Sequence, residues 1–255
     1  MSRLITTDFH IHTNLSDCGD VAATFEAVVQ GGIDARLEAI GVSDHIFFPH
    51  HTERSVIARG ALPKEVDGMK IWVGCEADME APTRAAIDAE FASTLDYVMV
   101  AASHLYDPAV EQEFIDEPRS MAYYMLELTR GAVELGFVDV ITHPLHVPAC
   151  RYTLEHFVAA ADESQMRDVA QTAAACGVAL ECNPKFVRAY PNASRRLFPL
   201  LLEEGCQLAI NSDAHHPRGI GCRGPEYATE EELRALGISE ECLFLIEDAA
   251  PRAVR

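Results

Sequence analysis

Histidine and carboxylate side chains recur along this sequence at positions where they could bind transition metals. They are His10, His12, Asp17, His45, Glu76, His104, His143, Asp213 and His215. Any one of them alone would more often be an ordinary core or surface residue. Gathered at equivalent places in a fold they have no packing explanation, because burying so many titratable groups is costly unless cations neutralise the acids and accept the imidazole lone pairs.

Nine candidate ligands are too many for one tetrahedral site. Zinc takes about four ligands, and a catalytic site leaves one position open for water. Two or three divalent ions fit better, with Glu76 or Asp213 as a bridging carboxylate. Mixed imidazole and carboxylate ligands suit zinc, manganese or iron and disfavour calcium and magnesium, which prefer oxygen atoms.

Short apolar or β-branched runs precede these candidates, and each run predicts a strand. The runs span 4–9, 39–42, 71–74, 97–101, 138–141, 178–181 and 207–210. A candidate ligand follows closely after each of them except the sixth. Amphipathic stretches between them predict helices near 22–31, 84–93, 118–135, 153–176, 194–204 and 229–236, while 46–69 and 102–117 resemble loops. His10 and His12 are two positions apart on an extended strand, so they should share one face.

This alternation is typical of repeated βα units around a parallel sheet, hence an α/β fold. Seven strands without a Pro/Gly/Ser-rich linker favour one closed or nearly closed barrel, and a single domain over residues 1–255. A doubly wound open sheet is the alternative. In both folds ligands bind at the carboxyl edge of the strands, so the candidates should meet at one mouth.

Composition narrows the function further. The 255 residues carry 40 acidic and 20 basic side chains, a formal net charge of −20 that opposes binding to nucleic acid. No run is long and apolar enough for a membrane helix or a signal peptide, and the eight cysteines are scattered like reduced thiols. We expect a cytoplasmic protein with no membrane or nucleic-acid partner. The apolar helix faces could form either the core or contacts between subunits, so both a monomer and an oligomer fit the sequence.

The ordered motifs resemble the PHP family, whose name stands for polymerase and histidinol phosphatase. They are HxH at His10 and His12, SDH ending at His45, the isolated Glu76, SH ending at His104, THP around His143 and SDAH ending at His215. The resemblance runs from Asp8 to about Gly221 and implies a distorted (β/α)7 TIM-like barrel with a trinuclear metal centre.

The resemblance also implies how the ligands divide among three metals. The implied sets are His10, His12, Glu76 and Asp213 for the first, Glu76, His104 and His143 for the second, and Asp17, His45 and His215 for the third. Some relatives have a histidine six residues after the second His of HxH, where this chain has Cys18, whereas Asp17 matches an HTxxSD form of the motif. The third metal is therefore the one in which this chain departs from the pattern.

Such a centre suits hydrolysis of a phosphate ester, because clustered cations stabilise negative charge on phosphoryl oxygens and lower the pKa of a bridging water. We predict a histidinol-phosphatase-like phosphomonoesterase that acts on a small phosphorylated metabolite through a metal-activated hydroxide, with Asp213 and His215 as possible assistants. Candidate phosphate-binding side chains are Lys185, Arg188, Arg218 and Arg54.

Three further side chains adjoin the candidate ligands. Asp8 and Asp44 could orient imidazoles or simply cap strand ends. Glu181 closes the sixth strand, where it could tie a loop or contact substrate.

Two other functions remain open on these motifs. A cyclic phosphate or nucleotide phosphodiesterase of the same family would use the same ligands. An amidohydrolase-type hydrolase of C–N or lactone bonds also has HxH on its first strand, but typically ends with a lone Asp and often bridges its metals through lysine. Asp213-x-His215 and Glu76 favour the phosphatase. A noncatalytic or exonucleolytic module like those of replicative polymerases is disfavoured by the negative charge.

Overall fold

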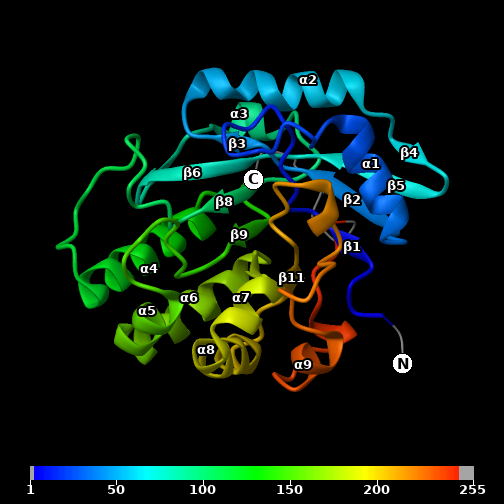
Figure 1. Ribbon diagram of the computed structural model, residues 1–255. Coiled ribbons are helices and arrows are strands. Elements are labelled where there is room, and N and C mark those ends of the chain that lie inside the picture. The colour runs from blue at the N-terminus through cyan, green and yellow to red at the C-terminus, as the bar shows by residue number, and fades with distance from the viewer. Residues whose placement is uncertain (1–2, 247–255) are drawn as a thin grey trace.

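The computed structural model describes residues 3–246 (Figure 1). Its parallel strands form seven segments of chain, two of which consist of two consecutive strands each. The strand β1 (Thr7–Asp8) pairs with β2 (Ala39–Val42), and β2 pairs with β5 (Met69–Val73). The chain continues from β2 into β3 (His45–Ile46) and from β5 into β6 (Glu76–Ala81), and β3 pairs with β6. The wall then proceeds through β8 (Met99–Ala101), β9 (Val140–Thr142), β10 (Ala179–Cys182) and β11 (Leu208–Ile210).

Residues just beyond the first and last strands close the wall. Ile11 forms a parallel bridge with Ala214. The amide of His12 donates to the carbonyl of Ala214 at 2.9 Å, and the amide of Ala214 donates to the carbonyl of His10 at 3.1 Å. The predicted α/β barrel is confirmed, its strands match the seven apolar runs, and the open-sheet alternative is wrong.

Helices pack around the strands (Figure 1). The longer ones are α1 (Phe25–Asp34), α4 (Pro118–Glu134), α6 (Glu163–Cys176) and α8 (Pro191–Glu203). All of these except α6 begin and end within a few residues of the amphipathic stretches. The shorter ones are α2 (Glu53–Ala61), α3 (Ala89–Ala92), α5 (Leu154–Ala160), α7 (Pro184–Ala189) and α9 (Glu230–Arg234), with 3-10 turns η1 (Pro49–Thr52), η2 (Pro217–Gly219) and η3 (Glu240–Cys242).

Several predicted elements are wrong in detail. The expected loop 46–69 contains α2 and the edge strand β4 (Glu65–Val66), which is antiparallel to β5. The expected helix 84–93 is instead the short strand β7 (Arg84–Ala85), which pairs with β6, followed by α3. The expected helix 153–176 is divided because Asp162 caps the start of α6 by accepting from the amides of Ser164 and Gln165.

An apolar layer lies below the carboxyl edge inside the barrel. Its central side chain is Tyr97, which is fully buried and donates from its hydroxyl to the carbonyl of Phe9 at 2.6 Å. A Cβ at Gly74 would lie 2.6 Å from the Tyr97 ring, and one at Gly41 would collide with the Tyr97 hydroxyl. Met99 of this layer pairs in register with Glu76, so the carboxylate stands beside apolar neighbours.

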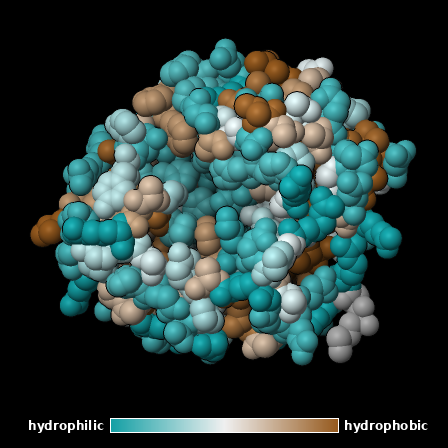
Figure 2. Space-filling model, in the orientation of Figure 1, coloured by the Kyte–Doolittle hydropathy of each residue, from teal (hydrophilic) through white to brown (hydrophobic). Residues whose placement is uncertain are grey.

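Hydrophilic residues dominate the face of the molecule shown in Figure 2, and hydrophobic residues are scattered over it in small groups. None of the helices between residues 3 and 246 is long and apolar enough to cross a bilayer.

The packing around Tyr97 predicts a stability difference between two glycine substitutions. We expect Gly41→Ala to lower the free energy of unfolding by about 1–3 kcal/mol, because the added methyl overpacks the barrel interior. The matched change Gly60→Ala, in α2 where no atom lies within 4 Å of the new methyl, should raise it by up to about 1 kcal/mol through helix propensity. Urea unfolding midpoints measure both, and equal midpoints would contradict the packing.

Candidate metal centre

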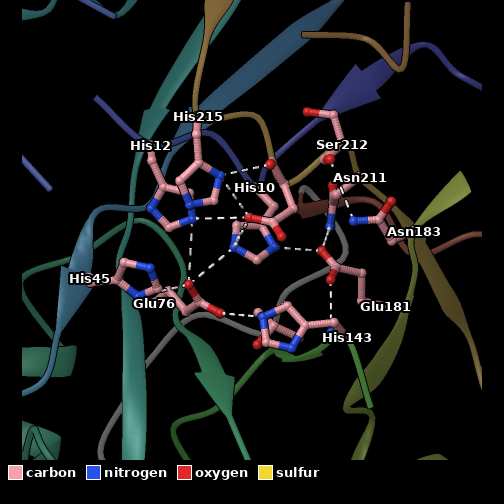
Figure 3. Close-up of polar contacts among 12 residues, drawn as sticks. His10, His12, His45, Glu76, His143, Glu181, Asn183, Asn211, Ser212 and His215 are labelled. Carbon is pink, nitrogen blue, oxygen red and sulfur yellow. Dashed lines mark hydrogen bonds and ion pairs between the residues drawn. The ribbon is translucent and has the colours of Figure 1, made fainter. Parts of the chain in front are cut away.

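The closure of the barrel brings together two segments that lie far apart in the sequence. His10 and His12 flank Ile11, and Asp213 and His215 flank its bridge partner. Both pairs point to the same side of the bridge, since Asp213 Oδ1 lies 3.2 Å from His12 Nε2. Figure 3 shows the imidazoles of His10 and His12 directed toward Glu76.

Glu76, the first residue of β6, lies at the centre of the site and is fully buried. Its Oε2 atom lies 3.2 Å from His10 Nε2 and 3.0 Å from His45 Nδ1, and its Oε1 atom lies 3.0 Å from His143 Nε2 (Figure 3). Among the described residues, neither carboxylate oxygen has a hydrogen-bond partner, and the same holds for His10 Nε2, His12 Nε2 and His45 Nδ1. Buried polar atoms without partners fit bound cations.

The potential ligand atoms form overlapping groups within 4.8 Å of one another. Two groups correspond to the first and second implied metals: His10, His12 and Glu76, and then Glu76, His104 and His143. Asp213 adds to the first group, since its Oδ1 atom lies 3.2 Å from His12 Nε2 and 3.5 Å from His10 Nε2. A further group joins His45, Asp78 and His104.

The remaining group departs from the predicted third set. It contains His12, Cys18, His45 and His215, and Asp17 is absent from it. The Asp17 side chain is 72% exposed and pairs with Arg54 at 3.1 Å. The turn after β1 directs residue 18 rather than residue 17 toward the imidazoles.

Two buried carboxylates orient the imidazoles from behind. Glu181 accepts from His10 Nδ1 at 2.7 Å and from the amide of His143 at 2.7 Å, so one side chain positions two candidate ligands (Figure 3). Asp78 lies 2.7 Å from His104 Nδ1. Such partners fix the tautomer and direct the opposite nitrogen outward. The spacing in the sequence could have placed Asp78 on the same face as Glu76, because the two residues are two positions apart on one strand.

Asp8 and Asp44 could either orient imidazoles or cap strand ends, and their hydrogen bonds favour the second role. Asp8 accepts from the amides of Ser212 and Gly221, and its burial raises its pKa to about 6. Asp44 accepts from the amide and hydroxyl of Thr13 and from the hydroxyl of Ser16. Both carboxylates therefore hold the loops that carry candidate ligands.

Charge compensation within the cluster is strong. Burial lowers the pKa of His10, but the carboxylates of Glu181 and Glu76 outweigh it and the pKa lies well above the ordinary value. Burial raises the pKa of Glu76 and of Asp213, but the neighbouring histidines outweigh it and both pKa values lie below the ordinary range. The carboxylates are thus ionised, the form that binds cations.

Two of the candidate ligands have left-handed backbone, with φ of 24° at His143 and 52° at Asp213. This region is uncommon for residues other than glycine and costs free energy. It persists here where the chain turns sharply at the end of a strand and directs a side chain into the site.

A cleft of about 420 Å³ opens above the cluster. The candidates His45, His104, His143, Asp213 and His215 line it together with Cys18, Phe47, Tyr106, Asp107, Pro108 and Pro148. Sequence analysis did not single out Phe47, Tyr106 or Asp107, since loop residues carry no periodic signal of what they face.

The four predicted phosphate-binding residues do not line this cleft. Arg188 donates to the carbonyl of Tyr227 at 2.8 Å and to Glu232 at 2.6 Å, so it joins α7 to α9. Arg54 is buried and donates to the carbonyl of His45 at 3.0 Å. Both cations are therefore held by other partners in this structure. Lys185 and Arg218 are exposed.

The sequence matches the PHP domain over residues 8–185, more than half of its length. The chain belongs to the PHP domain family. The match begins at Asp8, just before the HxH motif, and extends past Glu181, so it includes most of the cluster.

Solved structures resemble this PHP domain in fold. Histidinol phosphate phosphatase from Lactococcus lactis, crystallised with zinc, L-histidinol and phosphate, is 16% identical with a TM-score of 0.58, over 91% of this chain and 92% of that one. A candidate histidinol phosphatase from Listeria monocytogenes is 13% identical, also with a TM-score of 0.58, over 84% and 97%. A search of curated proteins found no match.

The position of Glu181 predicts its effect on metal binding. We expect Glu181→Gln to weaken zinc binding by about 10- to 100-fold, because His10 loses the charged partner that sets its tautomer. Isothermal titration with zinc measures the affinity. The control Glu65→Gln changes an exposed carboxylate of β4 and should leave the affinity unchanged; equal affinities for the two variants would exclude an orienting role.

Proposed function

We propose that this PHP domain is a metal-dependent phosphomonoesterase, similar to histidinol phosphatases, that hydrolyses a small phosphorylated metabolite. The observation that carries the proposal is a set of buried imidazole and carboxylate atoms beside a cleft, which have no hydrogen-bond partner within residues 3–246. The ligand chemistry fits two to three divalent ions of zinc, manganese or iron.

Family membership and the histidinol phosphate phosphatase neighbour support a phosphate substrate. That neighbour was crystallised with zinc, L-histidinol and phosphate, which are a transition metal and the two halves of a phosphate ester. Divalent ions bound here would neutralise phosphoryl oxygens and lower the pKa of a water. A cleft of about 420 Å³ lies within the range that binds small molecules.

The position of each residue in the site indicates its role. His10, His12, Glu76 and Asp213 would hold the first ion, and Glu76, His104 and His143 the second. Phe47 and Tyr106 offer apolar walls to the rest of the substrate.

His215 is placed to move a proton. It lines the cleft, and its Nδ1 atom lies 3.0 Å from the backbone carbonyl of Asp213. Burial lowers the pKa of His215, but Cys18 and Asp213 outweigh it and raise the pKa above the ordinary value. When no ion occupies the third site, a protonated imidazole at this position is suited to donating to a leaving alkoxide.

We further propose that the chain acts as one catalytic domain in the cytoplasm. The candidate ligands span residues 10–215, so no shorter part of the chain holds the whole cluster. The scattered cysteines suit a reducing compartment.

Metal removal tests the proposed activity directly. We expect chelation to abolish hydrolysis of phosphomonoesters, and zinc, manganese or iron to restore it. Glu76→Gln should lower kcat/KM by more than about 100-fold, since Glu76 would hold two ions directly whereas a residue such as Glu181 only orients a ligand. The exposed control Glu90→Gln should leave kcat/KM unchanged. The assay panel includes histidinol phosphate, sugar phosphates, cyclic phosphates and lactones. Unchanged phosphatase activity after chelation, or hydrolysis of lactones alone, would overturn the proposal.

Lys185 is the predicted cation that best fits a role in phosphate binding. It is exposed at the start of α7, and its charge acts on the nearby His146. We expect Lys185→Ala to raise KM by about 3- to 10-fold, the effect of losing one charge-assisted contact at a solvated rim. Arg188→Ala, which breaks contacts between α7 and α9, should leave KM unchanged. Steady-state kinetics separates the two, and the reverse order would refute this assignment.

A further inference from the structure

Cys18 lies in the metal-ligating group that the third implied ion would occupy. One ligand atom from each of His12, Cys18, His45 and His215 lies within 4.8 Å of the others. The thiol reaches the rings of both His45 and His215. Asp17, the oxygen ligand suggested by the motif, is turned to solvent and bound to Arg54.

The three imidazoles of this group point to a cation independently of the cysteine. His45 is more than nine-tenths buried, and its Nδ1 atom has no hydrogen-bond partner among the residues described. The His12 ring centroid lies 4.4 Å from that of His45 and 4.3 Å from that of His215. Rings packed so closely, with a nitrogen atom unsatisfied, are typical of a metal site.

The turn that carries Cys18 is rigidly held. The hydroxyl of Ser16 donates to Asp44 at 2.8 Å and accepts from the amide of His45 at 3.1 Å. The amide of Asp20 donates to the carbonyl of His215 at 2.9 Å. A Cβ at Gly19 would collide with the carbonyl of Thr13, so only glycine allows the chain to turn this tightly. The turn that carries Cys18 is therefore bonded both to β3, which supplies His45, and to the segment that carries His215.

We propose that the Cys18 thiolate, with His45 and His215, is a ligand of the third metal ion. The inference rests on the proposed metal centre and deepens it. Metal binding would release the thiol proton to solvent and form one metal–sulfur bond. Sulfur favours zinc or cobalt over manganese and magnesium, so this site selects softer ions than the two sites built from nitrogen and oxygen alone.

Cobalt substitution distinguishes this proposal from the metal centre itself. We expect the cobalt-loaded protein to show visible d–d bands and a near-ultraviolet sulfur-to-cobalt charge-transfer band. Cys18→Ser and Cys18→Asp should lose the charge-transfer band while the visible bands of the other ions remain. Cys176→Ser, at the end of α6 and outside every candidate group, should keep both.

Zinc affinity and thiol alkylation give two further readouts. Cys18→Ser should weaken zinc binding to the third site by more than about 10-fold. In the wild-type protein, free zinc at about 10 times the dissociation constant should slow alkylation of Cys18 about 10-fold, by mass action. Mass mapping of the alkylated peptide measures the protection.

The outcomes separate the two hypotheses. Visible cobalt bands without a charge-transfer band, or a charge-transfer band that survives in Cys18→Ser, would refute the thiolate ligand and leave the metal centre intact. Failure to bind cobalt or zinc at all would refute both.

Discussion

A carboxylate that is fully buried, and that has no hydrogen-bond donor among the described residues, imposes the main constraint on this fold. Glu76 is buried beside Met99 and beneath a ring of imidazoles. The other acids at the site, Asp213, Glu181 and Asp78, add negative charge in the same small volume. Histidines are neutral when they serve as ligands, so bound divalent ions would then balance this charge. The loops around the site hold the ring in the geometry that those ions need.

The support for this geometry comes in layers. Glu181 and Asp78 hold the rings of His10 and His104, and Asp8 and Asp44 hold the loops that carry other candidates. Below them the apolar layer around Tyr97 fills the barrel interior. A site whose ligands are locked by packing and hydrogen bonds loses little entropy when an ion binds, and this preorganisation favours affinity and selectivity.

The sequence was most informative where chemistry coincides with strand periodicity. Strand ends are set by apolar runs, so the convergence of His10, Glu76 and His143 could be predicted from their positions alone. The turn after β1 could not, because spacing does not decide whether residue 17 or residue 18 faces inward; that depends on Gly19 and on hydrogen bonds to Asp44.

The local sequence pattern was also a poor predictor of secondary structure and of side-chain partners where tertiary contacts compete with it. The helix α2 was read as a loop because His and Pro residues surround it, and the helix predicted over 153–176 is divided by an N-cap at Asp162. Arg188 sits on the expected rim, yet Glu232 from a distant helix engages it. An exposed cation offers no local signal of which anion it will meet.

The bridge between Ile11 and Ala214 joins residues about two hundred positions apart in the chain. During synthesis on the ribosome, the segment with the HxH motif emerges long before the segment with Asp213 and His215. A nascent chain therefore holds only part of the ligand set until nearly all of it has been translated. Ions captured earlier would find open, weak sites, so tight loading is coupled to the final closure of the barrel, a slow step with high contact order.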